Sequence, residues 1–197
     1  MNLILDKLST ILKERIGNVE FNTDFRIGIL FEMLMKDKKL SKEAKAIQSL
    51  RLYYPKIEQI ENIEKAYDDI IWFYSCGKIE ANNKKIKNLN NKEKSQKEDK
   101  IYDYDYDDGY IYSAFLQIYR IDLQDVDYLH WWKFKALFNS LMNDTKIVEI
   151  MGYRAIDLGK IKDKQEKARY KKLQNIYGLP DMRTEAQKES DFGSAFW

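Results

Sequence analysis

An acidic, tyrosine-rich stretch at residues 102–115, YDYDYDDGYIYSAF, contains the side chains whose spacing comes closest to a known chemical site. A helix–loop–helix calcium site needs ligands at loop positions 1, 3 and 5, glycine at 6 and glutamate at 12. Counting from Asp103 puts Asp108 at the glycine position and Ala114 at the glutamate position. Counting from Tyr104 places Gly109 at the glycine position, but tyrosines then occupy ligand positions 1 and 3. Neither register fits, so we expect no calcium ion here.

The same aspartates are well placed to start a helix. Asp107 and Asp108 precede a helix-like run, where carboxylates can accept hydrogen bonds from the free N–H groups of the first turn. Tyr102, Tyr104 and Tyr106 would then form a short extended strip on the surface. Such a strip could also receive an aromatic or basic partner.

No other residue set predicts catalysis or metal binding. His130 is the single histidine and lies in YLHWWKF, which is typical of a packed or surface helical histidine and leaves no other histidine for a catalytic triad. The single cysteine, Cys76, excludes a disulfide framework and a multi-cysteine zinc site. Neither a G-x-x-x-x-G-K-[ST] nor a G-x-G-x-x-G loop is present. We therefore expect no enzyme activity, no cofactor and no metal.

Two aromatic motifs remain as candidates for packing or partner binding. Trp131 and Trp132 are consecutive, so on a helix they point about 100° apart and cannot share one narrow stripe. We expect one in the core, with the other covering a neighbouring helix or anchoring a partner, as tryptophans often do. In MGYRAID, residues 151–157, Gly152 could permit a close approach or a turn, and Arg154 could pair with Asp157.

Composition favours a helical protein that binds neither nucleic acid nor membrane. The 197 residues include only eight glycines and two prolines, and 34 basic residues nearly balance 32 acidic ones. Near-neutral charge gives no general attraction to polyanions. The chain lacks an apolar run of about 20 residues, which a membrane span requires, and its first residues do not resemble a signal peptide.

Hydrophobic periodicity and capping residues predict an all-α, small multi-helix globular protein of about seven helices in two helical halves. The N-terminal half, 1–77, is ambiguous over 1–22; Thr23 or Asp24 opens a helix over 25–37. Two more helices run from Ser41 to Tyr54 and from Ile57 or Ile60 to Cys76, ended by Gly77. The C-terminal half, 101–180, has expected helices over 108–119, 125–142, 144–154 and 162–177, with Asp125 or Asp127 and Asp144 as N-caps.

The two halves are separated by residues 78–100, KIEANNKKIKNLNNKEKSQKEDK, which are rich in lysine and asparagine. A segment with so few apolar groups is typical of a flexible linker or exposed loop. A nucleic-acid-binding arm is the alternative, but the segment has no arginine or aromatic residue. The tail, 181–197, is polar apart from residues near its end.

Several strings together resemble a family of bacteriophage and prophage proteins, the "gp-fifteen" family of phages that infect Gram-positive bacteria. They are YDYDYDDGYIYSAF, IDL, YLHWWKFKALFNSL, IMGYRAIDLGKIKDKQEKARYKKLQNIYGLP and, in the first half, FNTDFRIGILFEML. The resemblance covers nearly the whole chain, and its tryptophan pair and MGYRAIDL are its most specific parts.

The resemblance implies a non-enzymatic role in tail morphogenesis, because members are typically encoded between the tail tube and tape measure proteins. We expect a tail assembly chaperone that acts in the host bacterial cytoplasm and binds the tape measure protein, with the tail tube protein as a second candidate partner. The alternative is a structural component retained in the assembled tail or tailocin. The residues we expect to bind the partner are Tyr128, Trp131, Trp132, Tyr153 and Arg154.

Overall fold

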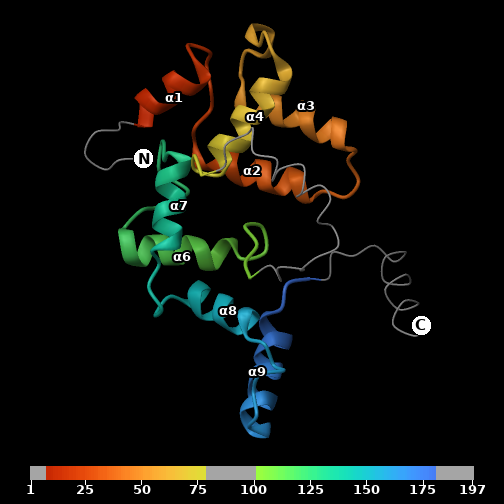
Figure 1. The fold of residues 1–197 in the computed structure, drawn as a ribbon. Coiled ribbons are helices and arrows are strands. Elements are labelled where there is room, and N and C mark those ends of the chain that lie inside the picture. Colours follow the sequence, from red (N-terminus) through yellow and green to blue (C-terminus); the bar gives the residue numbers. More distant parts are fainter. Residues whose placement is uncertain (1–7, 79–100, 181–197) are drawn as a thin grey trace, which may run out of the picture.

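The computed structural model describes residues 8–78 and 101–180, and its regular elements there are helices (Figure 1). Eight are α-helices, which confirms the all-α prediction, and one is a short 3₁₀ helix. Apart from Lys78, the predicted linker (78–100) and the C-terminal tail (181–197) lie outside the described residues. In chain order the elements are α1 (Leu8–Ile16), α2 (Phe25–Lys36), α3 (Lys42–Tyr53), η1 (Ile57–Gln59), α4 (Ile63–Tyr74), α6 (Asp108–Tyr119), α7 (Trp131–Asn139), α8 (Lys146–Ala155) and α9 (Lys164–Tyr177).

Helices α2, α3 and α4 begin where their sequences provide capping side chains. Asp24 accepts a hydrogen bond from the N–H of Arg26, Ser41 from that of Ala44, and Asn62 from that of Lys65. Each cap satisfies a backbone donor that the first turn would otherwise leave free. The helix expected from residue 57 or 60 onward is therefore divided: η1 comes first, and α4 starts only after Asn62.

Helix α7 joins the two halves of the chain through one continuous core. The N–H of Phe25 donates to the carbonyl of Leu129 over 2.8 Å, and the N–H of Trp131 donates to that of Thr23, also over 2.8 Å. The Trp131 side chain is fully buried against α2 and α4, and its Nε1 donates to the Tyr74 carbonyl at 2.9 Å. The buried residues of α2, α3, α4, α6 and α7 form a single hydrophobic cluster. Both described halves thus depend on the same packing.

The predicted helix over 125–142 is wrong at its N-terminal end, because α7 begins only at Trp131. The preceding residues are held in other conformations: Asp122 accepts from the N–H of Gln124 at 2.9 Å, and His130 pairs with Asp24 in an isolated bridge. His130, rather than Asp125 or Asp127, is the N-cap, and its Nδ1 accepts from the N–H of Trp132 at 3.1 Å.

A similar shift occurs at α8, where Thr145 takes the N-cap position expected for Asp144. Thr145 is buried, and its hydroxyl donates to the Met142 carbonyl at 2.8 Å. The N–H of Glu149 in turn donates to the Thr145 carbonyl, so the helical hydrogen bonds begin from this residue.

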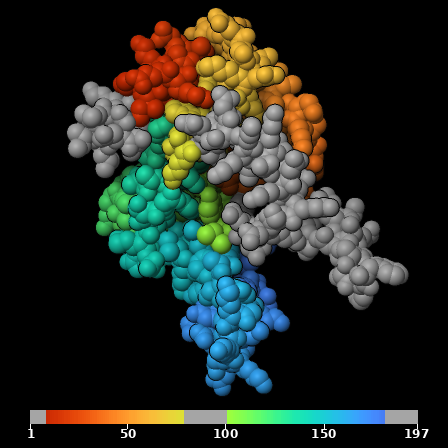
Figure 2. Space-filling view, viewed as in Figure 1, coloured from red at the N-terminus to blue at the C-terminus, as the bar shows by residue number. Residues whose placement is uncertain are grey.

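Helices α8 and α9 form an arm that projects away from α1–α4 (Figures 1 and 2). Helix α8 packs against α6, whereas α9 packs mainly against α8. No residue of α9 is buried. Among the described residues, no helix is long and apolar enough to span a bilayer.

The close packing of Trp131 on α2 requires glycine at residue 28. A Cβ atom added to Gly28 would overlap the six-membered ring of Trp131. We expect Gly28→Ala to lower the free energy of unfolding by about 2–3 kcal/mol, because both helices would have to move apart. Gly152→Ala in α8 is the matched control: its Cβ would have no neighbour within 4 Å, and alanine should stabilise that helix by up to about 1 kcal/mol. Urea denaturation measures both, and equal effects would contradict the packing described.

Buried His130 should make folding sensitive to mild acid. Burial, with a smaller contribution from Lys133, lowers the pKa of His130 from 6.5 to about 4. The unfolded chain therefore takes up a proton as the pH falls through about 6.5, whereas the folded protein does not until about pH 4. Between these values the wild type should lose about 2–3 kcal/mol of stability through this one group.

The matched variant is His130→Asn, which keeps an acceptor for the Trp132 N–H but does not titrate. We expect its denaturant stability to fall less steeply between pH 7 and pH 4 than that of the wild type. Parallel curves for the two proteins would show that His130 does not cause the loss.

Candidate protein-binding site

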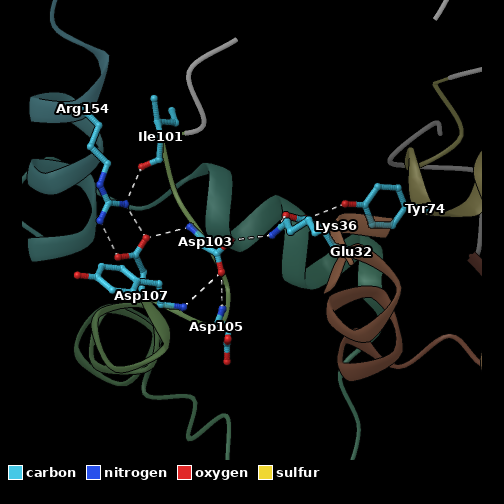
Figure 3. A network of polar contacts seen from close by, with 9 residues as sticks. Glu32, Lys36, Tyr74, Ile101, Asp103, Asp105, Asp107 and Arg154 are labelled. Carbon is cyan, nitrogen blue, oxygen red and sulfur yellow. Dashed lines mark hydrogen bonds and ion pairs between the residues drawn. The ribbon is translucent and has the colours of Figure 1, made fainter. Parts of the chain in front are cut away.

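The acidic stretch before α6 is folded around the carboxylate of Asp107 (Figure 3). Its Oδ2 accepts from the N–H of Asp103 at 2.9 Å, which closes a turn over residues 103–107. The two Arg154 terminal nitrogens donate to the two oxygens of Asp107, at 2.6 and 2.9 Å. The Asp107 side chain is 0% exposed and that of Arg154 is 6% exposed. Asp107 therefore occupies the N-cap position of α6, but its side chain makes no capping bond, contrary to our expectation.

Arg154 connects two further parts of the structure to this carboxylate. Its Nη1 also donates to the Ile101 carbonyl at 3.1 Å, and its Nε donates to the Tyr177 carbonyl at 2.6 Å. Arginine can make all these bonds at once because its guanidinium has five donors in a rigid plane. The pair predicted between Arg154 and Asp157 is therefore wrong: Asp157 instead accepts from the Gly159 N–H and lies near Lys160.

Asp103 links the same turn to α2 and α4. Its Oδ2 lies 3.1 Å from Nζ of Lys36, which also pairs with Glu32 at 2.8 Å. Tyr74 completes the chain by donating its hydroxyl to Glu32 at 2.7 Å. Burial, followed by the Glu32 charge, raises the pKa of Tyr74 far above its usual range, so this hydroxyl keeps its proton. These contacts run from α8 through the turn to α4, as Figure 3 shows.

The tyrosines of the stretch do not form a surface strip, which corrects that prediction. Tyr104 is buried against Phe134, Phe138 and Trp131. Lys135 donates to the Tyr104 hydroxyl and to that of half-buried Tyr102, each at 3.2 Å. Of Tyr102, Tyr104 and Tyr106 only Tyr106 is exposed, because the turn at residues 104–107 ends the alternation expected of an extended strand. In the described chain, no group of three or more acidic, histidine or cysteine side chains could hold a metal ion.

The two tryptophans predicted to bind a partner are both buried. Trp131 lies between α2 and α4, as described above. Trp132 covers the end of α4: its Nε1 donates to the Phe73 carbonyl at 2.7 Å, and its rings contact Trp72 edge-on. A partner could reach either indole only if α7 moved away from α4.

The other three predicted residues lie in two different places. Tyr128 precedes α7, is 54% exposed and shares a 2.6 Å hydrogen bond with Thr23. Tyr153 stacks on Tyr177 of α9 and hydrogen-bonds Glu149, so it helps hold the arm together. Arg154 is the buried partner of Asp107. The structure therefore does not bring the five residues into one site, and partner binding by them stays a prediction, with Tyr128 the most accessible.

Sequence reasoning missed the most distinctive surface, which is the outer face of α6. The inner face of this helix packs through Ile111, Ala114 and Phe115. Between Asp108 and Arg120 there is no charged residue, although a third of the chain is charged. The outward residues are therefore uncharged, and they include Tyr110 at 37% and Leu116 at 39% exposure. We call the exposed uncharged residues of this helix the α6 face: Gly109, Tyr110, Ser113, Leu116 and Gln117.

Small residues leave room along the α6 face. A Cβ added to Gly109 would meet nothing within 4 Å, and Ser113 bends its hydroxyl back to the Tyr110 carbonyl at 3.0 Å. The absence of charge over eleven residues was the signal that could have identified this face from the sequence. Exposed tyrosine and leucine beside small residues are suited to contact with another protein.

The fold and this surface define a small all-helical protein with an uncharged, exposed helix face. The chain belongs to the bacteriophage Gp15 protein family, whose model matches residues 4–179. This match confirms the resemblance inferred from the sequence strings. No curated protein and no solved structure matches the chain significantly.

The buried Asp107–Arg154 pair should be strongly coupled energetically. Asp107→Ala or Arg154→Ala alone should cost about 3–5 kcal/mol, because each leaves an uncompensated buried charge. The double variant should cost clearly less than the two single costs combined, since it removes both charges. Urea unfolding of the four proteins measures this coupling. Additive costs would mean that the pair does not hold the turn as described.

Proposed function

We propose that this bacteriophage protein is a tail assembly chaperone, which acts by binding rather than by catalysis. Its partner is the tape measure protein, and the tail tube protein is a second candidate. The family match supports a phage role, and the α6 face is the single structural observation that carries the proposal.

The α6 face is suited to a helical partner with an apolar stripe. An amphipathic helix can lie along another helix when small residues allow close approach and apolar groups meet. Gly109 and Ser113 would provide the approach, while Tyr110 and Leu116 would provide apolar contact on either side. Tyrosine adds a hydroxyl that stays hydrated in the free protein, so the face can be exposed before the partner arrives.

The face is also held rigidly, which favours binding. Residues Ile111, Ala114 and Phe115 fix α6 from within, and the Asp107–Arg154 pair fixes its first turn. A pre-ordered surface loses little conformational entropy on association, so more of the contact energy appears as affinity. A chaperone must nonetheless release its client, and a face of this small size is consistent with reversible binding.

The proposal predicts that charges placed on the α6 face will prevent capture of the tape measure protein. We expect Tyr110→Glu combined with Leu116→Glu to reduce co-purification at least about tenfold, because two carboxylates would be buried without partners. The melting temperature should change little, since both side chains are exposed. Co-expression with the tape measure protein followed by affinity pull-down provides the measurement.

The matched control is Ile47→Glu with Ile63→Glu, which places the same charges on exposed apolar residues of α3 and α4. This control should capture the tape measure protein as the wild type does. Wild-type protein that fails to capture it would reject the proposal. Fixed-stoichiometry presence of the protein in purified particles would instead favour a structural component of the tail.

A further inference from the structure

The arm carries a strongly basic surface on α9 and the residues leading into it. Residues 160–172, KIKDKQEKARYKK, hold seven basic and two acidic residues, although the whole chain has a net charge of only +2. The half-buried residues of α9, which face α8, are Tyr170, Leu173, Gln174 and Tyr177. All five basic residues of α9 are exposed: Lys164, Lys167, Arg169, Lys171 and Lys172.

No acidic side chain in the described part of the chain forms an ion pair with these five residues. Arg169 lies over the ring of neighbouring Tyr170, at 5.9 Å from its centroid. One apolar residue accompanies them on the outer side: Ile176 is 57% exposed. Ile176 lies seven residues after Arg169 and four residues after Lys172, so the three side chains lie along one face of the helix. We call these three residues the α9 ridge.

A surface of opposite character lies where α6 begins. A hollow of about 240 Å³ there has an apolar floor lined by Ile29, Ile111, Leu123 and Phe134. Asp108 lines the same hollow, together with Tyr112, whose hydroxyl lies 3.1 Å from Oδ2 of Asp122. Asp125 belongs to the same loop, and its N–H donates to Oδ1 of Asp122 at 3.3 Å. We call this surface the acidic hollow.

Arg26 contacts the loop beside the acidic hollow but does not neutralise the hollow. Arg26 lies beneath the 122–127 loop, but it pairs with Asp24 and donates to the carbonyls of Leu123 and Val126. Residues 103–127 contain seven acidic residues and one basic residue, Arg120. The two surfaces thus complement each other in charge and in shape: an apolar residue beside two cations, and an apolar hollow beside three carboxylates.

We propose that the α9 ridge of one copy of this protein docks in the acidic hollow of a second copy. Ile176 enters the apolar floor, while Arg169 and Lys172 approach Asp108, Asp122 and Asp125. Because α9 packs on α8 while the hollow belongs to α2, α6 and α7, each copy uses a different surface from its partner. Such head-to-tail contacts generate rings when they close and filaments when they do not.

The observations favour a second copy over a nucleic acid. The outer side of α9 has no aromatic residue on which a base could stack, and four of its five cations are lysines. An apolar residue at the end of the ridge has no use against phosphates but fits the hollow. The inference does not rest on the proposed chaperone role, although Gly109 of the α6 face also lines the hollow, and it is tested on the isolated protein.

Sedimentation analysis of the full chain tests the proposal through charge reversal. Wild-type protein should self-associate at about 50 mM salt and dissociate as added salt screens the ionic contacts. Arg169→Glu with Lys172→Glu should weaken self-association at least about tenfold, and so should Asp108→Lys with Asp125→Lys. Mixing these two variants should restore association, because each reversed surface then meets a complement on the other protein.

Lys13→Glu with Lys42→Glu is the control, since it changes the net charge equally at exposed residues of α1 and the start of α3. It should associate like the wild type, and circular dichroism melting should show every variant folded. Three results would each overturn the proposal. They are a wild type that stays monomeric, a control that self-associates as weakly as the ridge variant, and a mixture of the two reversed variants that stays monomeric. Duplex DNA binding that is lost in the ridge variant, with no change in mass, would overturn it in favour of a nucleic-acid surface.

Discussion

The contact of Trp131 with α2 and α4 is the constraint on which the rest of the structure depends. Gly28 lets the indole lie directly on the α2 backbone, and the Tyr74 carbonyl satisfies its one donor. A fully buried tryptophan contributes more apolar area than any other side chain, but its N–H must find a partner. The α7 backbone is fixed at the same point by the bonds that Thr23 and Phe25 make to residues 129–131. Two halves separated in sequence therefore share one core rather than touching at a surface.

The Asp107–Arg154 ion pair is the second contact that organises the fold, because it acts on a part of the chain that Trp131 does not reach. Trp131 fixes α7, and Tyr104 packs beside it, but neither contact determines how α8 and the arm are attached. The Asp107–Arg154 pair adds to that attachment by joining the first turn of α6 to α8, Ile101 and Tyr177, beside the buried α8 residues Ile147 and Ile150. Buried ion pairs add little net stability compared with well-packed apolar groups, but they tolerate few alternative arrangements. We therefore expect this pair to select one geometry of the arm more than to increase its stability.

Much of the fold could be predicted from local signals, and the misses share one cause. Asp24 and Ser41 mark helix starts by short-range capping chemistry: Ser41 was predicted alone, and Asp24 as one of two candidates with Thr23. The start of α7 was misread because residues 128–131 bond to residues 23–25, a contact about a hundred residues away that no local pattern reports. The same holds for Arg154, whose true partner is 47 residues away whereas Asp157 is nearby in sequence. The capping residue His130 lacks the usual preference for that position and could not be recognised by type.

The aromatic content of the chain led us to expect a tryptophan-rich binding surface. In the structure, the large aromatic residues and the most distinctive surface are in different places. Burying large rings lowers free energy most where they pack together, so Trp131, Trp132 and Tyr104 enter the core. What distinguishes the α6 face is instead the lack of charge in a chain that is charged elsewhere. Desolvating lysine or glutamate opposes association, so a surface without them needs fewer compensating contacts to bind. The core and the α6 face thus act in sequence: the buried aromatics and the Asp107–Arg154 pair immobilise α6, and its uncharged outer side can then bind without first being ordered.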